Sequence, residues 1–349
     1  MMDRILVVLP NWFGETLFAT PFLRALRHER HHARIATLGR PACRDILLHN
    51  PYVDELVDYD ERGVHRTAAG KWRLIQALRA RRFDGAFILR RSLSRTLLLA
   101  LAGIPMRIGF AHPKSGWLLT TRVRPPDQAT HKAMGYLALL EAFGYPPAPG
   151  PYDYAVSEPE RQDAIAFLAR EGLGPDRPLV ILHPGANWPH KRWPAERFAE
   201  VGDRLQERDR LPLAITGGPD DVELAEGLKR RMRHPAVVLA GRTTLRQLAA
   251  CLEQAHLVIS NDTGVLHLAA ALFRPIVALY GPTSPAFTGP LGDPERTVVV
   301  HHPDCCPQVP CFSPEQPPHP GMDAISVEEV VAAARGLLAP ADTRGGHPG

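Results

Sequence analysis

The stretch "RILVVLPNWFGETLFATPFLRAL", residues 4–26, decides the fold of the first half of the chain. Its apolar run at 4–9 has the length and the β-branched content of a buried strand, and the segment from Thr16 onward has the spacing of an amphipathic helix. A turn that contains Pro10 and the dipeptide Gly14-Glu15 separates them. A strand that leads through such a turn into a helix is the first part of a βαβ unit. We therefore ask what the carboxylate of Glu15 does just beyond the end of a strand.

The same alternation of short apolar runs and helical segments continues along the chain, which indicates parallel sheets. A Pro-rich segment at 144–160 interrupts it, and 349 residues exceed the usual size of one hydrophobic core. The sequence therefore predicts an α/β protein with two doubly wound, Rossmann-like domains that face a central cleft. The expected domains are 1–150 and 151–340, followed by a disordered tail at 341–349. Strands are predicted at 4–9, 33–39, 54–60, 85–90 and 106–111, and within 178–185, 211–218, 235–241, 256–262 and 275–281.

The composition is that of a globular protein, with 45% hydrophobic residues, 22% charged residues and a net charge of +4. No basic stripe with interleaved aromatic residues is present, which argues against binding of nucleic acid. The five cysteines form no disulfide framework, so a reducing cytosol fits best. We expect neither a signal peptide nor a membrane span, since the most apolar run, 96–105, is too short to cross a bilayer.

Polar loops follow the predicted strands of the second half, where ligands of doubly wound sheets bind. In "SNDTGVLHLAAA" (260–271), a strand ends in Asp262-Thr263-Gly264 and a helix begins. The first amides of that helix form an anion site, Thr263 adds a hydroxyl, and His267 lies on the same helix face. The alternative is that Asp262 or Thr263 merely caps the helix.

Two further loops carry charged candidates. In "HPGANWPHKRWP" (183–194), Lys191 is a suitable partner for a diphosphate, although a Lys-Arg pair is more often a solvated face. In "TGGPDDVE" (216–223), Glu223 is a candidate to accept hydrogen bonds from ribose hydroxyls, although acids are favoured in any first helical turn. The chain has neither a phosphate-binding G-x-x-x-x-G-K-[ST] loop nor a G-x-G-x-x-G fingerprint, which argues against ATPases and NAD enzymes.

Three stretches in register resemble glycosyltransferase family 9, the ADP-heptose–lipopolysaccharide heptosyltransferases: 5–27, 183–205 and 260–285. The "PGANWPHKRWP" form looks most like the heptosyltransferase II branch. The resemblance implies a GT-B fold, inverting transfer from ADP-L-glycero-D-manno-heptose, and no cofactor or metal ion. It implies that Lys191 binds the donor diphosphate, with Asp262, Thr263, Gly264 and His267 around it, and that Glu223 lies near the ribose. It also implies that Glu15 is the general base, at a turn where the family usually has Asp.

The resemblance further implies an acceptor, the anionic lipopolysaccharide inner core, and a cytoplasmic enzyme that can contact the inner face of the inner membrane. Basic residues of the first half are candidates to bind that acceptor: Arg90, Arg91, Arg95, Lys114, Arg122 and Arg124. Two alternatives stay open, namely a family 9 transferase with another sugar or acceptor, and a catalytically silent nucleotide-sugar binding protein.

Two motifs are set aside. "DYD" (58–60) spells a metal-binding pattern of other glycosyltransferases, but it lies in a predicted strand. Cys305, Cys306 and Cys311 lack the spacing that tetrahedral zinc sites favour, so we expect a structural loop there.

Overall fold

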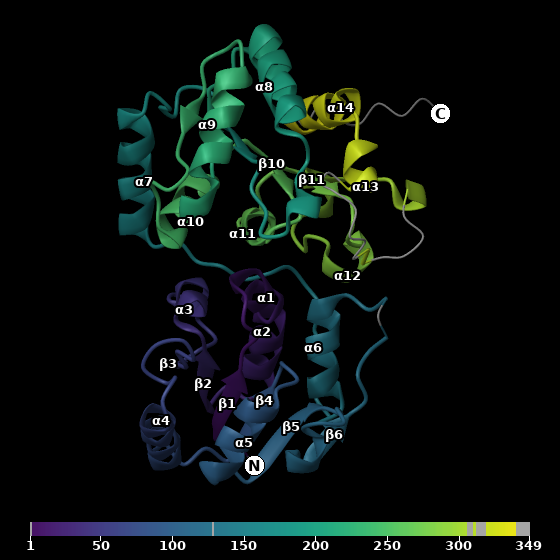
Figure 1. Ribbon diagram of the computed structural model, residues 1–349. Coiled ribbons are helices and arrows are strands. Elements are labelled where there is room, and N and C mark those ends of the chain that lie inside the picture. The colour runs from purple at the N-terminus through teal and green to yellow at the C-terminus, as the bar shows by residue number, and fades with distance from the viewer. Residues whose placement is uncertain (1, 128, 306–309, 312–318, 340–349) are drawn as a thin grey trace. The chain divides into compact units, whose positions relative to one another are not determined.

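The computed structural model describes residues 2–127, 129–305, 310–311 and 319–339. The chain divides into two compact units, Met1–Ala155 and Val156–Gly349 (Figure 1). The division falls five residues beyond the position expected from the sequence. The reason is that Asp153 belongs to the first unit, where its amide donates to Thr20 Oγ1 at 2.8 Å and its carboxylate pairs with Arg24 at 2.5 Å.

The first unit contains a six-stranded sheet in the order β3-β2-β1-β4-β5-β6, and every neighbouring pair is parallel. This is the strand order of a doubly wound fold. Successive strands are added in one direction from β1 to β3 and in the opposite direction from β4 to β6, so the order reverses between the neighbouring strands β1 and β4. The strands are β1 (Arg4–Val8), β2 (Arg34–Gly39), β3 (Glu55–Asp58), β4 (Gly85–Ile88), β5 (Met106–Phe110) and β6 (Thr121–Val123). The helices are α1 (Phe13–Phe18), α2 (Thr20–Glu29), α3 (Pro41–Leu47), α4 (Ala68–Ala80), α5 (Leu93–Leu101) and α6 (Lys132–Glu141).

Both faces of this sheet are buried, which explains why its strands are continuous apolar runs. Alternate residues such as Leu6 and Val8 point into a core that α4 and α5 complete. On the opposite face, Phe87 of β4 meets Phe22 of α2 with ring centroids 5.4 Å apart. The helix α6 packs beside α2 on that face.

The second unit repeats the same plan with the order β12-β11-β10-β7-β8-β9, again parallel throughout. The direction in which successive strands are added reverses between the neighbouring strands β7 and β10. The strands are β7 (Val180–His183), β8 (Leu213–Ile215), β9 (Val237–Val238), β10 (Leu257–Asn261), β11 (Ile276–Tyr280) and β12 (Thr297–His301). The helices are α7 (Glu158–Arg170), α8 (Ala195–Asp209), α9 (Val222–Arg231), α10 (Leu245–Glu253), α11 (Gly264–Ala271), α12 (Pro285–Thr288), α13 (Pro320–Asp323) and α14 (Val327–Leu338).

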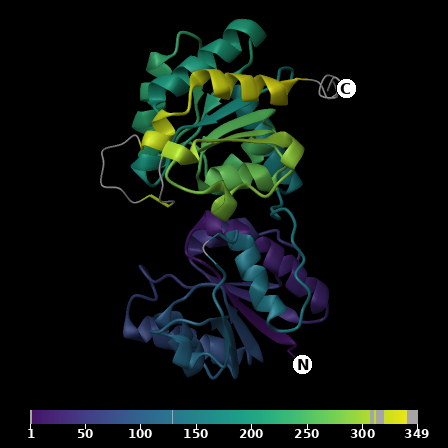
Figure 2. The same cartoon turned by 90° about the vertical axis from the view of Figure 1, so that its right-hand side faces the viewer.

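One face of the second sheet is covered by α8, α9 and α14, whose apolar residues join the strands in a single core. Figure 2 shows α14 running along this face. It is the closing helix expected at 325–338. Within the part of the chain that the structure describes, no helix is both long enough and apolar enough to span a bilayer.

All ten strands predicted from the sequence are present, and the structure adds β6 and β12. The added strands both lie at the edge of their sheet.

Candidate active site

The carboxyl ends of β7 and β10 meet at the point where the strand order of the second sheet reverses, because these two strands are paired. Lys191 follows β7 and Asp262 follows β10. The Nζ atom of Lys191 lies 2.5 Å from Oδ2 of Asp262, so the two loops are joined by an ion pair at this edge. The position is the one at which doubly wound sheets bind ligands.

Asp262 is the centre of this cluster, and only 5% of it is exposed. Its Oδ2 also accepts a hydrogen bond from Thr283 Oγ1 at 2.6 Å, and Nε2 of His267 lies 3.6 Å from its Oδ1. Burial by itself raises the pKa of this carboxyl, but His267 and Lys191 outweigh burial and hold the pKa below its usual value. Asp262 is therefore ionised at neutral pH, although it is buried.

The two loops are also fixed by an amide side chain. Asn261 Oδ1 accepts a hydrogen bond from the Trp193 amide at 3.1 Å, and Asn261 Nδ2 donates to the Pro184 carbonyl at 2.8 Å. The indole of Trp193 is buried and donates to the Ile325 carbonyl at 3.1 Å. Lys191 therefore extends from a turn that is anchored on both sides.

The helix α11 begins directly beside this ion pair. Thr263 occupies its N-cap position, but its side chain makes no capping hydrogen bond. The hydroxyl lies 3.5 Å from that of Ser260. The expected alternative, a purely capping threonine, therefore does not describe this side chain. Gly264 and the residues after it present amide groups at the positive end of the helix, where an anion is stabilised.

Glu223 lies apart from this cluster. It is exposed in the first turn of α9, and in the described ranges it makes no side-chain hydrogen bond or ion pair. Asp221 is the acid that reaches toward the loop after β7, and no feature of the sequence distinguishes it from its acidic neighbours. Its Oδ1 lies 3.7 Å from Arg192 Nη2, and its Oδ2 would lie 2.6 Å from a Cβ atom added to Gly185. Gly185 is needed for this close approach.

His183 ends β7 beneath these loops and is fully enclosed. Its Nδ1 lies 3.1 Å from the hydroxyl of Thr216. Burial lowers the pKa of this imidazole to about 4, so it is neutral at pH 7. It supports the loop and adds no charge to the site.

In the first unit, Glu15 lies in the first turn of α1, just beyond β1. Its Oε1 accepts a hydrogen bond from Lys132 Nζ at 2.7 Å, at the start of α6. Tyr136 lies one turn further along α6 and is buried, and both burial and the charge of Glu15 raise the pKa of its hydroxyl. Glu15 remains 25% exposed, so a substrate can reach its carboxylate. No sequence pattern pointed to Lys132, which is 117 residues away from Glu15 in the chain.

Arg95, expected as a surface contact for the acceptor, is buried and only 1% exposed. Its guanidinium donates to the Leu9 carbonyl at 2.7 Å and to Asn11 Oδ1 at 2.6 Å, and it lies 3.3 Å from Glu61 Oε2. Leu9 and Asn11 follow β1, whereas Arg95 follows β4. The residue therefore fixes the turn that precedes Glu15, and the prediction that it lies on the surface is wrong.

The two motifs set aside above show no metal geometry where they are described. Asp60 of "DYD" accepts a hydrogen bond from the Gly63 amide at 2.9 Å and so closes a turn after β3. Cys305 and Cys311 are free thiols, and Cys306 lies outside the described residues. Over the described ranges, no group of three His, Cys, Asp or Glu side chains is arranged to hold a metal ion. The absence of a metal requirement stays a prediction.

A family model described as glycosyltransferase family 9 (heptosyltransferase) matches residues 71–317. The chain belongs to glycosyltransferase family 9. It is therefore an enzyme that transfers a glycosyl group, as the sequence motifs indicated.

Several family 9 relatives are similar over nearly their full length. Lipopolysaccharide heptosyltransferase 2 of Salmonella typhimurium is 30% identical, with 84% of this chain and 87% of the relative covered. The crystal structure of a family 9 glycosyltransferase from Veillonella parvula matches with a TM-score of 0.86 at 28% identity, covering 96% of this chain and 97% of that one. The structure of E. coli ADP-heptose lps heptosyltransferase II matches with a TM-score of 0.80 at 27% identity, covering 96% and 98%. The predicted GT-B type α/β fold is confirmed by these family 9 structures.

Proposed function

We propose that this enzyme transfers L-glycero-D-manno-heptose from ADP-heptose to the inner core of lipopolysaccharide, with inversion at the anomeric carbon and without a metal ion. The observation that carries the proposal is the ion pair of Lys191 and Asp262 beside the start of α11, at the reversal point of the second sheet. The similarity to the ADP-heptose lps heptosyltransferase II of E. coli supports ADP-heptose as the donor.

The donor diphosphate would bind at this cluster. Lys191 supplies a positive charge, the first amides of α11 supply further donors, and Thr263 supplies a hydroxyl. Asp262 stays ionised and keeps the Lys191 ammonium directed toward the helix start. During the reaction negative charge accumulates on the departing ADP. Fixed donors of this kind stabilise such charge without reorganising, which is the part that a metal ion plays in other transferases.

Asp221 extends the donor proposal. It lies closer than Glu223 to the turn after β7, so it replaces Glu223 as our first candidate for the ribose hydroxyls. Glu223 remains the candidate derived from the sequence, and its exposed position on α9 leaves it free to reach a bound nucleotide.

Glu15 would act as the general base. An acceptor hydroxyl attacks the anomeric carbon, its proton passes to the Glu15 carboxylate, and the bond to ADP breaks on the opposite side. A single displacement needs one base and gives inversion. Lys132 holds one carboxylate oxygen of Glu15 at 2.7 Å, which leaves the other oxygen for the acceptor. Glu is one methylene longer than the Asp usual in the family, and this tether to Lys132 fixes where the longer side chain places its carboxylate.

The acceptor would be an anionic glycolipid, and the exposed basic residues of the first unit remain candidates to bind it, without Arg95. Contact with the inner face of a membrane belongs to the same proposal, because a glycolipid acceptor is carried by a bilayer. No cofactor other than the donor is needed in this scheme.

The proposal is tested by mass spectrometry of product formed from ADP-heptose, ADP-glucose and UDP-sugars, with inner-core acceptors and EDTA present. We expect heptose transfer from ADP-heptose alone. Glu15→Gln should lower kcat by about 100- to 10,000-fold, the usual contribution of a general base. The matched control is Glu141→Gln, at an exposed position of the same unit, which should leave kcat unchanged.

Other results would change the assignment. Full turnover by Glu15→Gln would show that Glu15 is not the base. Binding of ADP-heptose without product at any enzyme concentration would favour the silent binding protein, and Glu15→Asp would then test whether the usual acid restores transfer. Transfer of another sugar would identify a family 9 enzyme of different specificity.

A further inference from the structure

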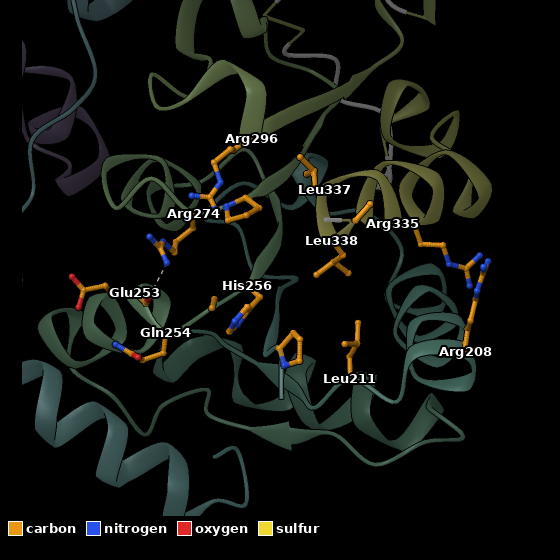
Figure 3. A pocket seen from close by; sticks show the side chains of 14 residues that line it. Arg208, Leu211, Glu253, Gln254, His256, Arg274, Arg296, Arg335, Leu337 and Leu338 are labelled. Carbon is orange, nitrogen blue, oxygen red and sulfur yellow. Dashed lines mark hydrogen bonds between the residues drawn. The ribbon is translucent and has the colours of Figure 1, made fainter. Parts of the chain in front are cut away.

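A pocket of about 660 Å³ lies in the second unit at the amino ends of its strands, the edge opposite to the candidate active site (Figure 3). Pro178, Leu211, His256 and Pro275 line it, and each immediately precedes or lies within two residues of the start of a strand. The volume is within the range of pockets that bind small molecules. Nothing in the proposed transfer reaction uses this edge.

Four arginines give the pocket its charge. Arg274 and Arg296 come from the segments before β11 and β12, and Arg208 and Arg335 come from the last turns of α8 and α14 (Figure 3). Basic residues at helix ends are favoured by the helix dipole, which accounts for Arg208 and Arg335 without any ligand. It does not account for Arg274 and Arg296.

Among the lining side chains that the structure describes, Glu253 is the one carboxylate, and it is already paired. Glu253 receives two hydrogen bonds from Arg161, at 2.7 and 3.0 Å, and Arg161 is not part of the pocket. Within the described ranges, no carboxylate lies within ion-pair distance of Arg208, Arg274 or Arg296. The pocket therefore has a large excess of positive charge.

Two of these charges are held close together and partly out of water. Arg274 Nε donates to the Leu272 carbonyl at 2.9 Å and its Nη1 donates to the Glu253 carbonyl at 3.0 Å, which fix the guanidinium in place. Burial lowers the pKa of Arg274, and the nearby charge of Arg296 lowers it further, against a smaller opposing effect of the Glu253 carboxylate. Two like charges that are kept together in this way leave an electrostatic cost that an anion would remove.

Apart from Gln254 and His256, the remaining lining is apolar. Leu211, Leu337 and Leu338 form apolar walls of the pocket (Figure 3), and Pro275 also lines it. Arginine guanidinium groups are matched in shape and charge to the oxygens of a phosphate group, and apolar walls favour a hydrocarbon portion beside it. A phosphate ester that carries an apolar group satisfies both features.

We propose that this arginine pocket is a second ligand site, separate from the active site, that binds a phosphate ester with an apolar substituent. Such a group occurs in soluble organophosphates and in the headgroup region of anionic phospholipids. The shared chemistry is a phosphate held by Arg274 and Arg296 with hydrocarbon against Leu337 and Leu338.

Calorimetric titration of the full chain with hexyl phosphate, inorganic phosphate and hexanol tests whether the pocket binds a soluble organophosphate. Co-sedimentation with vesicles of phosphatidylcholine, or of equal parts phosphatidylcholine and phosphatidylglycerol, tests whether the pocket binds the headgroup of an anionic phospholipid. The test variant is Arg208→Gln/Arg296→Gln, because neither side chain makes a hydrogen bond within the described part of the protein. The matched control is Arg170→Gln/Arg230→Gln, which removes the same charge from two exposed positions of the same unit.

We expect hexyl phosphate to bind more tightly than inorganic phosphate, and hexanol not to bind. The test pair should weaken binding by about 10-fold or more, since Arg296→Gln removes a charge-assisted contact to the phosphate and Arg208→Gln lowers the positive charge of the pocket. The control pair should not weaken it, and the unfolding midpoint should stay unchanged in both. Binding to vesicles that contain phosphatidylglycerol, without binding of hexyl phosphate, would assign the site to lipid. Absence of both, or equal weakening by the control pair, would overturn the proposal.

Discussion

Replacing Lys191 with methionine tests the electrostatic design of the donor site. The substitution keeps the length of the side chain but removes the charge that lies 2.5 Å from Asp262 Oδ2. Asp262 is then a buried carboxylate that keeps only the hydroxyl of Thr283, at 2.6 Å, and the more distant imidazole of His267.

The expected cost follows from burial. Removing one partner of a fully buried ion pair lowers the free energy of unfolding by about 3–5 kcal/mol. The Lys191 side chain is 22% exposed, and Thr283 remains as a donor, so the loss should be smaller. We expect Lys191→Met to lower the free energy of unfolding by about 2–3 kcal/mol at neutral pH.

The pH dependence has a definite sign. In the native protein Lys191 and His267 hold the pKa of Asp262 below its usual value, so the stability that this pair contributes is present at neutral pH and is lost only in acid. Without Lys191, burial becomes the larger influence and raises the pKa of Asp262. The variant takes up its proton at a higher pH than the native protein does. Its deficit should therefore shrink as the pH falls toward about 5.

Urea unfolding followed by tryptophan fluorescence measures these differences, since Trp193 is buried next to Lys191. The control is Lys229→Met, at an exposed position of α9. Lys191→Met/Asp262→Asn should recover to within about 1 kcal/mol of the native protein, because no uncompensated charge remains. A loss below about 0.5 kcal/mol for Lys191→Met, or a double variant no more stable than the single one, would refute the reasoning.

Arg95→Met should lower the free energy of unfolding by about 3 kcal/mol, because it leaves the carbonyl of Leu9 and the side chain of Asn11 without their buried donor; urea unfolding measures it. In the native protein the buried His183 imidazole has a pKa of about 4 and binds fewer protons than it does in the unfolded chain, so the free energy of unfolding falls by up to about 3 kcal/mol between about pH 6.5 and 4. His183→Gln should remove this part of the pH dependence, which urea unfolding at several pH values measures. Lys132→Met should lower kcat about 10-fold with little change in KM, since the freed Glu15 carboxylate is less well oriented for proton transfer; steady-state transfer kinetics measure it.

Each of these predictions has its own control. Arg91→Met, at an exposed neighbour of the same segment, should cost less than about 0.5 kcal/mol, and an equal cost at both positions would count against the role given to Arg95. An unchanged pH slope in His183→Gln would show that another group titrates. Lys132→Arg should retain most of the rate, and full activity in Lys132→Met would mean that Glu15 needs no tether.

The framework of the fold could be predicted from the sequence because buried parallel strands are continuous apolar runs, as "RILVVL" and "LVIS" are. The edge strands β6 and β12 were not predicted. An edge strand can be short and partly exposed, and β6 has only three residues, of which Val123 alone is buried. In β12 the run "TVVVH" does have the β-branched composition of a strand, but it is short, only Val300 is buried, and it follows loops rich in Pro and Gly.

The candidate site could be predicted in part. Lys191, Asp262 and His267 could be expected together because they follow paired strands, and the structure joins them. The tether of Glu15 to Lys132 could not be expected, because no local pattern relates a turn after β1 to the first turn of α6. The burial of Arg95 could not be expected because arginine is seldom buried, and its two shortest hydrogen bonds go to a carbonyl and an amide, which leave no trace in a pattern of charges.

The repeated strand order makes the chain divisible for engineering. Asp153 is fastened to Arg24 and Thr20, whereas Ser157 begins α7 through a reciprocal capping box with Glu160. A crossover placed between Asp153 and Ser157 therefore leaves both of these contacts within their own halves, and each half keeps its hydrophobic core. Chimeras that exchange one half with that of another family member at this joint would show which half sets the sugar preference and which half sets the acceptor preference.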